Sequence, residues 1–266
     1  MGKALKIDFV GAGNLAWNLA PALENAGASV RNIYSRNPEN AQKLAGKLYE
    51  GQVKTDLDFS SNEADVILIA VADDAIEEVA KEIILPDNIL IAHTSGSVPL
   101  STLGYLASSN IGVFYPLQTF TKHQRANFSE IPFFVEAENN FTRNALTKLA
   151  KQVSSNVYNI SSSQRQQLHL AAVFANNFTN WILTQSQAIL KESDLDLSLL
   201  QPLLEQSIAK AIELDPKNAQ TGPAKRGDFE VLDAQMELLA PQPERQELYR
   251  LITQQIVNYY QPEYDD

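Results

Sequence analysis

The chain has 266 residues, which is long enough for two domains. Its composition, 44% hydrophobic and 20% charged, is typical of an ordinary soluble globular protein. The formal net charge of −11 argues against nucleic acid or an anionic membrane as the main partner, because both attract positive fields. The absence of cysteine excludes disulfides, thiolate nucleophiles and sulfur-ligated metals.

The beginning of the sequence leads directly into an expected strand, which leaves no room for a signal peptide. No apolar run approaches the roughly 18 residues that a membrane span needs. We therefore expect a cytoplasmic protein that does not bind membranes. The histidines, His93, His123 and His169, have no ligand-type spacing and no carboxylate cluster beside them, so we expect no catalytic metal.

The first 160 residues alternate between short β-rich runs and segments with helical spacing. The expected strands cover residues 5–10, 29–34, 66–71, 89–92, 112–114, 133–135 and 157–160. Between several of them, apolar residues recur with the period of a helix, as Leu15, Leu19 and Leu23 do. Strands that alternate with helices predict an α/β fold, with a doubly wound and mostly parallel sheet.

After residue 160 the strand pattern stops and helical patterns replace it. We expect one long helix from about 162 to 191 and further helices at about 203–214, 229–239 and 244–260. The turn-rich segment 215–227 predicts a loop. The sequence thus predicts an α/β domain at residues 1–160 and an all-helical domain at residues 161–266.

The first expected strand is followed at once by Gly11-Ala12-Gly13-Asn14-Leu15-Ala16 and an amphipathic helix. Gly11 permits a tight turn, Gly13 lets the backbone approach a pyrophosphate, and the small Ala16 allows close packing of helix on sheet. Phosphate oxygens would then meet free N–H groups at the positive end of the helix dipole. The motif in this context predicts a dinucleotide-binding Rossmann domain, with residues 11–15 in the cofactor site.

The end of the second expected strand indicates which dinucleotide binds. An NAD site would place an acidic residue there for the ribose hydroxyls, whereas this chain has Ser35 and Arg36. A guanidinium group suits a 2′-phosphate, and the hydroxyl of Ser35 lies beside it in sequence. We therefore expect NADP as the cofactor. The alternative for Arg36 is a solvated surface charge.

Two further segments end strands at the same edge of the sheet. Val71 and Ala72 form the next lip of the crevice in which ligands of open α/β sheets bind. Ser95, in the segment after the expected strand at residues 89–92, is placed to meet the nicotinamide or the substrate. Ser-Gly is also common turn chemistry, so a purely local role for Ser95 is the alternative.

With these residues assembled, the N-terminal half resembles the superfamily of pyrroline-5-carboxylate reductases, β-hydroxyacid dehydrogenases and deazaflavin-dependent NADP reductases. The later motifs, at residues 93–96, 115–120, 169–177 and 221–228, resemble those of bacterial Rossmann-like proteins with a C-terminal domain of unknown function (family 2520). The resemblance implies an NADP oxidoreductase with a helical second domain similar to that of 6-phosphogluconate dehydrogenase. It also implies a homodimer formed by this helical domain and an active site between the two halves.

Two positions depart from those relatives. The group often has histidine where this chain has Tyr115, so a substrate-binding or acid–base role there falls to a phenol. β-Hydroxyacid dehydrogenases have a catalytic lysine three residues before an Asn-Asn pair, and aligning that pair on Asn176 and Asn177 places Val173 at the lysine position. Since valine cannot transfer a proton, the mechanism of those dehydrogenases is not inherited.

His169 is the candidate that replaces the lysine. It lies seven residues before Asn176, so α-helical spacing predicts that both project from one face. Facing the cleft, His169 would donate a proton or orient the substrate, with Asn176 as a catalytic partner and Asn177 as a substrate-binding residue. A histidine hydrogen-bonded on a helix surface is the alternative.

The segment Thr221–Asp228 contains two adjacent cations, Lys225 and Arg226, between glycines. These cations would clamp a substrate carboxylate or a cofactor phosphate, with Lys225 close to the reaction and Arg226 binding substrate. A capped surface loop with solvated charges is the alternative.

Together these residues predict an NADP-dependent oxidoreductase that transfers a hydride to or from a small, anionic carbonyl or imine substrate. An imine would need less help than a ketone, because a protonated imine is already electrophilic. The alternative is a protein that binds NADP without turnover, as a sensor or a scaffold dimer, because Val173 at the lysine position is what a degenerate enzyme would show.

Overall fold

The structure, a computed structural model, describes residues 4–261. The chain divides into two compact units, residues 1–174 and 175–266. The first unit therefore includes the first helix after the last strand. A functional boundary near residue 160 stays a prediction. Within the described residues, no helix combines the length and the apolar character that a membrane crossing needs.

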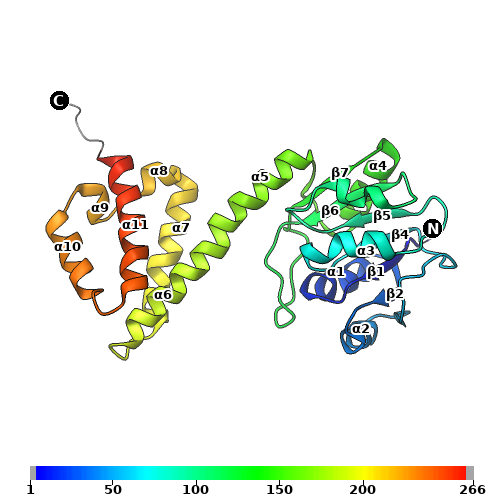
Figure 1. Ribbon diagram of the computed structural model, residues 1–266, viewed down its shortest axis with the longest axis horizontal. Helices are drawn as coiled ribbons and strands as arrows, with labels where there is room; N and C mark the ends of the chain where they lie inside the picture. Colours follow the sequence, from blue (N-terminus) through cyan, green and yellow to red (C-terminus); the bar gives the residue numbers. More distant parts are fainter. Residues whose placement is uncertain (1–3, 262–266) are drawn as a thin grey trace. The chain divides into compact units, whose positions relative to one another are not determined.

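An eight-stranded sheet forms the centre of the first unit, in the order β3-β2-β1-β4-β5-β6-β7-β8 (Figure 1). Neighbouring strands are parallel except β6 and β7, which are antiparallel. The predicted doubly wound, mostly parallel sheet is thus confirmed, although the short β3 was not expected. The strands are β1 (Lys6–Val10), β2 (Ser29–Tyr34), β3 (Gln52–Lys54), β4 (Val66–Ile69), β5 (Leu90–His93), β6 (Ile111–Pro116), β7 (Phe133–Ala137) and β8 (Val157–Asn159).

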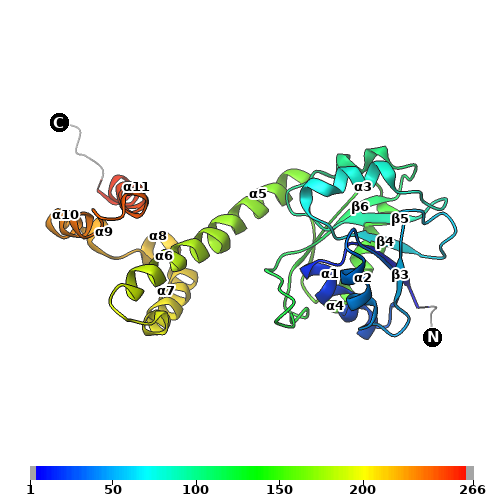
Figure 2. The ribbon, with the colours of Figure 1, turned by 60° about the horizontal axis from the view of Figure 1, so that its bottom comes forward.

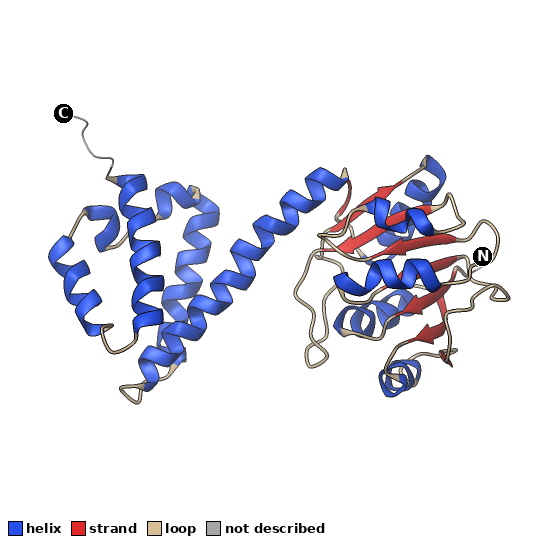
Figure 3. Cartoon of the chain, viewed as in Figure 1, coloured by secondary structure: helices blue, strands red, loops and turns tan. Residues whose placement is uncertain are grey.

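Helices cover both faces of this sheet (Figures 2 and 3). On one face lie α1 (Asn14–Asn25), α2 (Pro38–Ala45) and α4 (Asn140–Val153), which share one buried cluster with the strands. On the other face lie α3 (Ile76–Glu82) and the 3-10 helix Leu100–Tyr105, which share a second cluster. Because both faces are covered, β4 consists entirely of buried apolar residues.

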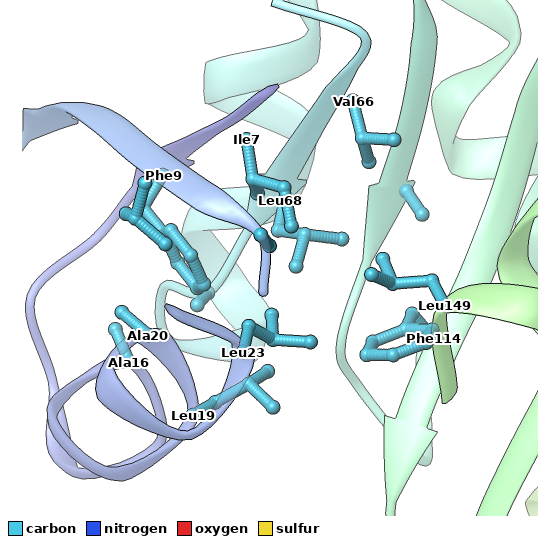
Figure 4. Packing of buried hydrophobic residues seen from close by; sticks show 14 of the residues in the cluster. Ile7, Phe9, Ala16, Leu19, Ala20, Leu23, Val66, Leu68, Phe114 and Leu149 are labelled. Atoms are coloured by element: carbon cyan, nitrogen blue, oxygen red, sulfur yellow. The ribbon is translucent and has the colours of Figure 1, made fainter. Parts of the chain in front are cut away.

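The packing of α1 on β1 and β4 fixes the glycine turn that joins β1 to α1 (Figure 4). Leu19 and Leu23 of α1 are fully buried in the same cluster as Phe9 of β1 and Leu68 of β4. Each buried leucine contributes about 1.5–3 kcal/mol relative to an exposed one. Ala16 is also fully buried, as expected for the small residue that lets a helix approach the sheet.

The order of the strands places a ligand crevice next to this turn. The chain runs from β1 through β2 to β3 on one side and then returns to β4 on the other side of β1. Such a reversal separates the loops that follow β1 and β4 at the carboxyl edge of the sheet. Ligands of open α/β sheets bind at this switch point.

The long helix expected from residue 162 is interrupted. Ser161 and Gln164 form a capping box at the start of α5 (Ser162–Ala172). A π-helical turn, Val173–Phe178, then precedes α6 (Thr179–Lys191). Turns of this kind frequently occur at functional sites.

The second unit consists of helices, drawn from yellow to red in Figure 1. The segment 215–227, expected to be a loop, contains two one-turn helices that each begin with a proline. Proline suits the first turn of a helix, where its missing N–H is not needed. The helices that follow α6 are α7 (Gln201–Leu214), α8 (Pro216–Ala219), α9 (Pro223–Arg226), α10 (Phe229–Leu238) and α11 (Pro243–Tyr260).

Candidate functional site

A cavity of about 600 Å³ opens at the carboxyl edge of the sheet. Its wall is formed by the segments that follow β1, β2, β4 and β5, together with Tyr115 of β6 and His169 of α5. All of these residues belong to the first unit. The volume lies in the range of small-molecule and cofactor sites.

The turn after β1 has the geometry of a phosphate cradle. Gly11 has a φ of +114°, and a Cβ atom there would lie 2.2 Å from the carbonyl oxygen of Ala70. Gly13 precedes α1 without a side-chain cap, and a Cβ atom there would meet only the Ala70 oxygen, at 4.0 Å. The first N–H groups of α1, at Asn14 and Leu15, therefore remain available to an anion. These residues fit a dinucleotide pyrophosphate.

Ser35 and Arg36 line the same cavity next to this turn. The side chain of Asn37 accepts a hydrogen bond from the N–H of Glu39 at 3.0 Å and so caps α2. Within the described chain no carboxylate forms an ion pair with Arg36, and its residue is exposed. The guanidinium group of Arg36, which has no ion pair among the described residues, therefore lies at the position where a 2′-phosphate would require a cation.

The segment after β4 forms the facing lip. Val71 and Ala72 line the cavity, as does Asp73. The carboxylate of Asp73 accepts a hydrogen bond from the hydroxyl of Ser97, which ties this lip to the segment after β5. The segments that follow β4 and β5 are therefore joined by a side-chain hydrogen bond as well as by the pairing of the two strands.

Ser95 lines the cavity, but its hydroxyl oxygen also shapes its own loop. It accepts hydrogen bonds from the N–H groups of Ser97 at 3.1 Å and Val98 at 3.0 Å. The turn chemistry considered for Ser95 is therefore present. A contact with nicotinamide or substrate stays a prediction.

His93, the last residue of β5, is hydrogen-bonded to the loop that contains Ser95. It is fully buried, and its Nδ1 accepts a hydrogen bond from the N–H of Ser95 at 3.2 Å. Burial lowers the pKa of His93 to about 3, and the positive charge of Arg165 acts in the same direction, against smaller opposing effects of Asp73 and the Pro99 backbone. A neutral imidazole is the form that can accept this bond.

Arg165 of α5 is fully buried and joins α5 to the sheet. Its Nε and one terminal nitrogen donate to Oε2 of Glu136 on β7, at 3.1 and 3.0 Å. The other terminal nitrogen donates to the carbonyl oxygens of Ser95 and Gly96, both at 3.0 Å. The remaining carboxylate oxygen of Glu136 accepts the Ser162 hydroxyl. The ion pair thus has several of the additional hydrogen bonds that a buried pair needs.

One turn further along α5, His169 meets Tyr115. The Tyr115 hydroxyl lies 3.1 Å from Nδ1 of His169. Burial raises the pKa of Tyr115 to about 12, with Asp73 acting in the same direction and Arg165 against it. A Cβ atom on Gly96 would lie 2.5 Å from this Nδ1 and 2.6 Å from Cζ of Tyr115, so only glycine leaves space for the pair. The structure thus brings two predicted residues, Tyr115 and His169, together.

The other predicted residues belong to the second unit. Asn176 and Asn177 are exposed in the π-helical turn. This turn interrupts the α-helical spacing from which a shared face for His169 and Asn176 was expected. Nε and a terminal nitrogen of Arg226 donate to Asp228, at 2.9 and 2.6 Å, and Lys225 donates to the carbonyl oxygen of Gln220 at 2.9 Å. Roles for these four residues stay predictions.

Sequence reasoning missed Arg165, Glu136 and the steric role of Gly96. Arg165 lies four residues before His169, on the same face of α5, which is the local signal that was available. Glu136, the partner of Arg165, is 29 positions away in sequence, and no local sequence pattern predicts that pairing. Among residues 4–261 no group of three or more histidine, aspartate or glutamate residues could hold a metal ion.

Two family profiles match the chain. Residues 6–96 match the family described as "NADP oxidoreductase coenzyme F420-dependent", and residues 131–256 match a domain of unknown function, DUF2520. A search among curated proteins finds no match.

Solved structures extend over nearly the whole chain. A Bacteroides fragilis protein, provisionally described as an NADP oxidoreductase, is 38% identical, with a TM-score of 0.88 over 96% of this chain and 98% of that one. A Thermotoga maritima protein is 24% identical, with a TM-score of 0.68 over 95% and 98%. An imine reductase from Pseudomonas sp. is 14% identical, with a TM-score of 0.64 over 97% and 92%. The last two show a shared fold.

Replacing each glycine of the turn by alanine should change a different property: the stability for Gly11 and the NADPH affinity for Gly13. Gly11→Ala places Cβ against the Ala70 carbonyl at a positive φ, so we expect the first unit to lose about 1–3 kcal/mol of stability. Gly13→Ala has space and an ordinary φ of −76°, so it should fold normally yet bind NADPH at least about tenfold more weakly. Thermal unfolding and fluorescence titration measure the two effects. Unchanged NADPH affinity in a folded Gly13→Ala variant would exclude the turn as the pyrophosphate site.

The neutral state of His93 predicts a pH-dependent stability. From pH 6.5 down to about 3 the unfolded chain binds a proton on this residue that the folded chain does not. The contribution of His93 to the free energy of unfolding is therefore fully present above pH 6.5 and is lost progressively as the pH falls toward 3. In urea unfolding between pH 7 and 4.5, His93→Gln should show a shallower decline than the wild-type protein. Equal slopes would contradict the assignment.

Proposed function

The chain belongs to the family of Rossmann-like NADP oxidoreductases whose C-terminal domain is DUF2520, and on that premise we propose that it transfers a hydride between NADP and a small, anionic carbonyl or imine compound. One observation supports this proposal above all. A single cavity has the uncapped start of α1 at one side and the Tyr115–His169 pair in another wall. The cavity thus has a group for phosphate and a group for protons.

The cofactor site consists of backbone and side-chain groups with separate tasks. Residues 11–15 hold the pyrophosphate through N–H groups, and Ser35 and Arg36 bind the 2′-phosphate. Val71 and Ala72 cover the opposite side of the nucleotide. NADP, when bound, supplies or accepts the hydride, and the protein supplies orientation and protonation.

His169 is the proposed proton donor. The raised pKa of the Tyr115 hydroxyl, about 12, keeps that hydroxyl protonated at physiological pH, and in the imidazolium form of His169 its oxygen accepts the hydrogen bond from Nδ1–H. The Nε2 proton of this imidazolium passes to the carbonyl oxygen or the imine nitrogen, and His169 is left as the neutral Nδ1–H imidazole, which regains a proton from water. Tyr115 is then a positioning residue that selects the tautomer of His169. It also contributes to the wall against which substrate binds.

Further groups complete the proposed substrate site. Ser95 and Asn176 are proposed to orient the reacting group, and Asn177 to bind substrate. Lys225 and Arg226 are proposed to bind its anionic group. Because Arg226 already pairs with Asp228, a substrate carboxylate would have to compete with that side chain, whereas Lys225 is held by a neutral carbonyl. This contrast favours Lys225 as the primary anion-binding residue.

A cytoplasmic homodimer is part of the proposal. Among the described residues of the second unit, the buried apolar side chains are Ala224 and Leu232. A unit with so small a core needs further burial, and exposed apolar surface on this scale marks an interaction site. A second copy of the helical unit would provide it. Large apolar side chains that are exposed there include Trp181, Ile189, Leu199, Leu203, Ile208, Ile212, Leu238 and Leu251.

The alternative function is NADP binding without turnover, as a sensor or scaffold. Val173 at the position of the relatives' lysine favours it. The Tyr115–His169 pair favours catalysis, because its close approach depends on a glycine at position 96. A screen of NADPH oxidation against cyclic imines and keto acids separates the two functions. Tight NADPH binding with no turnover of any compound would favour the sensor.

For the enzyme, His169→Ala should lower kcat about 100-fold or more on the best compound of that screen and leave NADPH affinity unchanged. Tyr115→Phe should lower kcat less, because the imidazole remains while its tautomer is no longer fixed. His123→Ala, which removes an exposed histidine outside the cavity, is the matched control. Turnover that His169→Ala leaves unaffected would eliminate His169 as proton donor.

For the dimer, Ile212→Glu should weaken self-association at least about tenfold, because a charge would enter an apolar interface. Ile212 is 81% exposed in the single chain. Gln206→Glu adds the same charge to an exposed position of the same helix and serves as the control. Light scattering across a dilution series measures both variants. A wild-type chain that remains monomeric at micromolar concentration would refute the dimer.

A further inference from the structure

Lys122 does not line the nucleotide cavity, but it comes from a distant part of the chain to contact a residue of the cavity wall. It lies in the segment between β6 and β7, and its Nζ donates to Oδ1 of Asn40 at 3.3 Å. Asn40, in the first turn of α2, lines the cavity together with Ser35 and Arg36. The ammonium group therefore lies one hydrogen bond away from the wall proposed to bind the 2′-phosphate.

The segment that contains Lys122 is anchored on α1. The side chain of Asn18, which is 9% exposed, donates to the carbonyl oxygen of Thr121 at 2.9 Å and accepts from the N–H of Ala126 at 3.2 Å. These bonds hold the residues on both sides of Lys122 against the helix that follows the phosphate turn. The position of the ammonium group is thus built into the fold.

The surroundings of Lys122 leave its charge available. Its Nζ lies 5.2 Å from the centre of the Trp17 ring, and no carboxylate within the described residues forms an ion pair with it. Arg36 also has no ion pair there. A cation in the cavity wall, Arg36, and a second cation bonded to that wall, Lys122, are notable in a chain of net charge −11. The carboxylates that line the cavity, Asp73, Glu78 and Glu82, come from the facing lip and α3.

We propose that Lys122 is a second cation for the 2′-phosphate of NADP, acting with Arg36, and therefore a residue that determines the preference for NADP over NAD. A phosphate dianion can accept from an ammonium group and a guanidinium group at once. Asn40 would bridge them, because its Oδ1 accepts from Lys122 while its amide nitrogen can donate to the phosphate. This inference rests on one part of the proposed function, the binding of NADP beside Ser35 and Arg36, and does not depend on hydride transfer.

The test uses nucleotides that carry no nicotinamide, so that its result does not depend on hydride transfer. Calorimetry compares 2′,5′-ADP with 5′-ADP on the full chain. Lys122→Met should weaken binding of 2′,5′-ADP about tenfold and leave binding of 5′-ADP unchanged. Lys122→Arg, which keeps the charge, should retain most of the affinity and so excludes misfolding as the cause.

Lys47→Met is the matched control. Lys47 also lies over the Trp17 ring, at 3.9 Å, and like Lys122 it does not line the nucleotide cavity. Among the described residues only Lys122 of the two has a side-chain hydrogen bond to a residue of the cavity wall. It should leave both affinities unchanged, whereas an equal loss in the Lys47 and Lys122 variants would show a general charge effect and overturn the proposal. Unchanged binding of 2′,5′-ADP by Lys122→Met would overturn it as well. A wild-type chain that binds neither nucleotide would instead refute the cofactor site itself.

Discussion

The buried guanidinium group of Arg165 connects the parts of the first unit on which the contact between Tyr115 and His169 depends. A charge without exposed surface is costly unless it is paired and hydrogen-bonded, and Glu136 and the carbonyl oxygens of Ser95 and Gly96 meet this need. Because Arg165 and His169 are one turn apart on α5, these bonds also set where His169 meets Tyr115. Removing either partner of the ion pair would leave an uncompensated charge and release α5 from the loop after β5.

The cavity combines two kinds of recognition that follow from different physics. On one side, the uncapped N–H groups at the start of α1 can donate to a phosphate, and glycines provide access. The Tyr115–His169 side consists of side chains instead. Burial keeps the Tyr115 hydroxyl protonated and His93 neutral, so His93 keeps the hydrogen bond that it accepts from the N–H of Ser95 at physiological pH.

How much the sequence could predict depended on the range of the interaction. The glycine turn and β2 were predicted closely, because a turn and an apolar strand are written in adjacent residues. The contact of Tyr115 with His169 spans 54 positions, and that of Lys122 with Asn40 spans 82. Such pairings depend on the packing of α5 and of the β6–β7 segment, which no local pattern specifies. The short helices within 215–227 were missed because their prolines and glycines also suit a loop.

The most direct test of the central claim is a crystal structure of the NADP⁺ complex. We expect the pyrophosphate at the N–H groups of Asn14 and Leu15, and the 2′-phosphate beside Arg36. The nicotinamide ring should lie beside Gly96, with room for a substrate between its C4 atom and Nε2 of His169. A nucleotide bound elsewhere, or a nicotinamide ring directed away from Gly96 and His169, would contradict it.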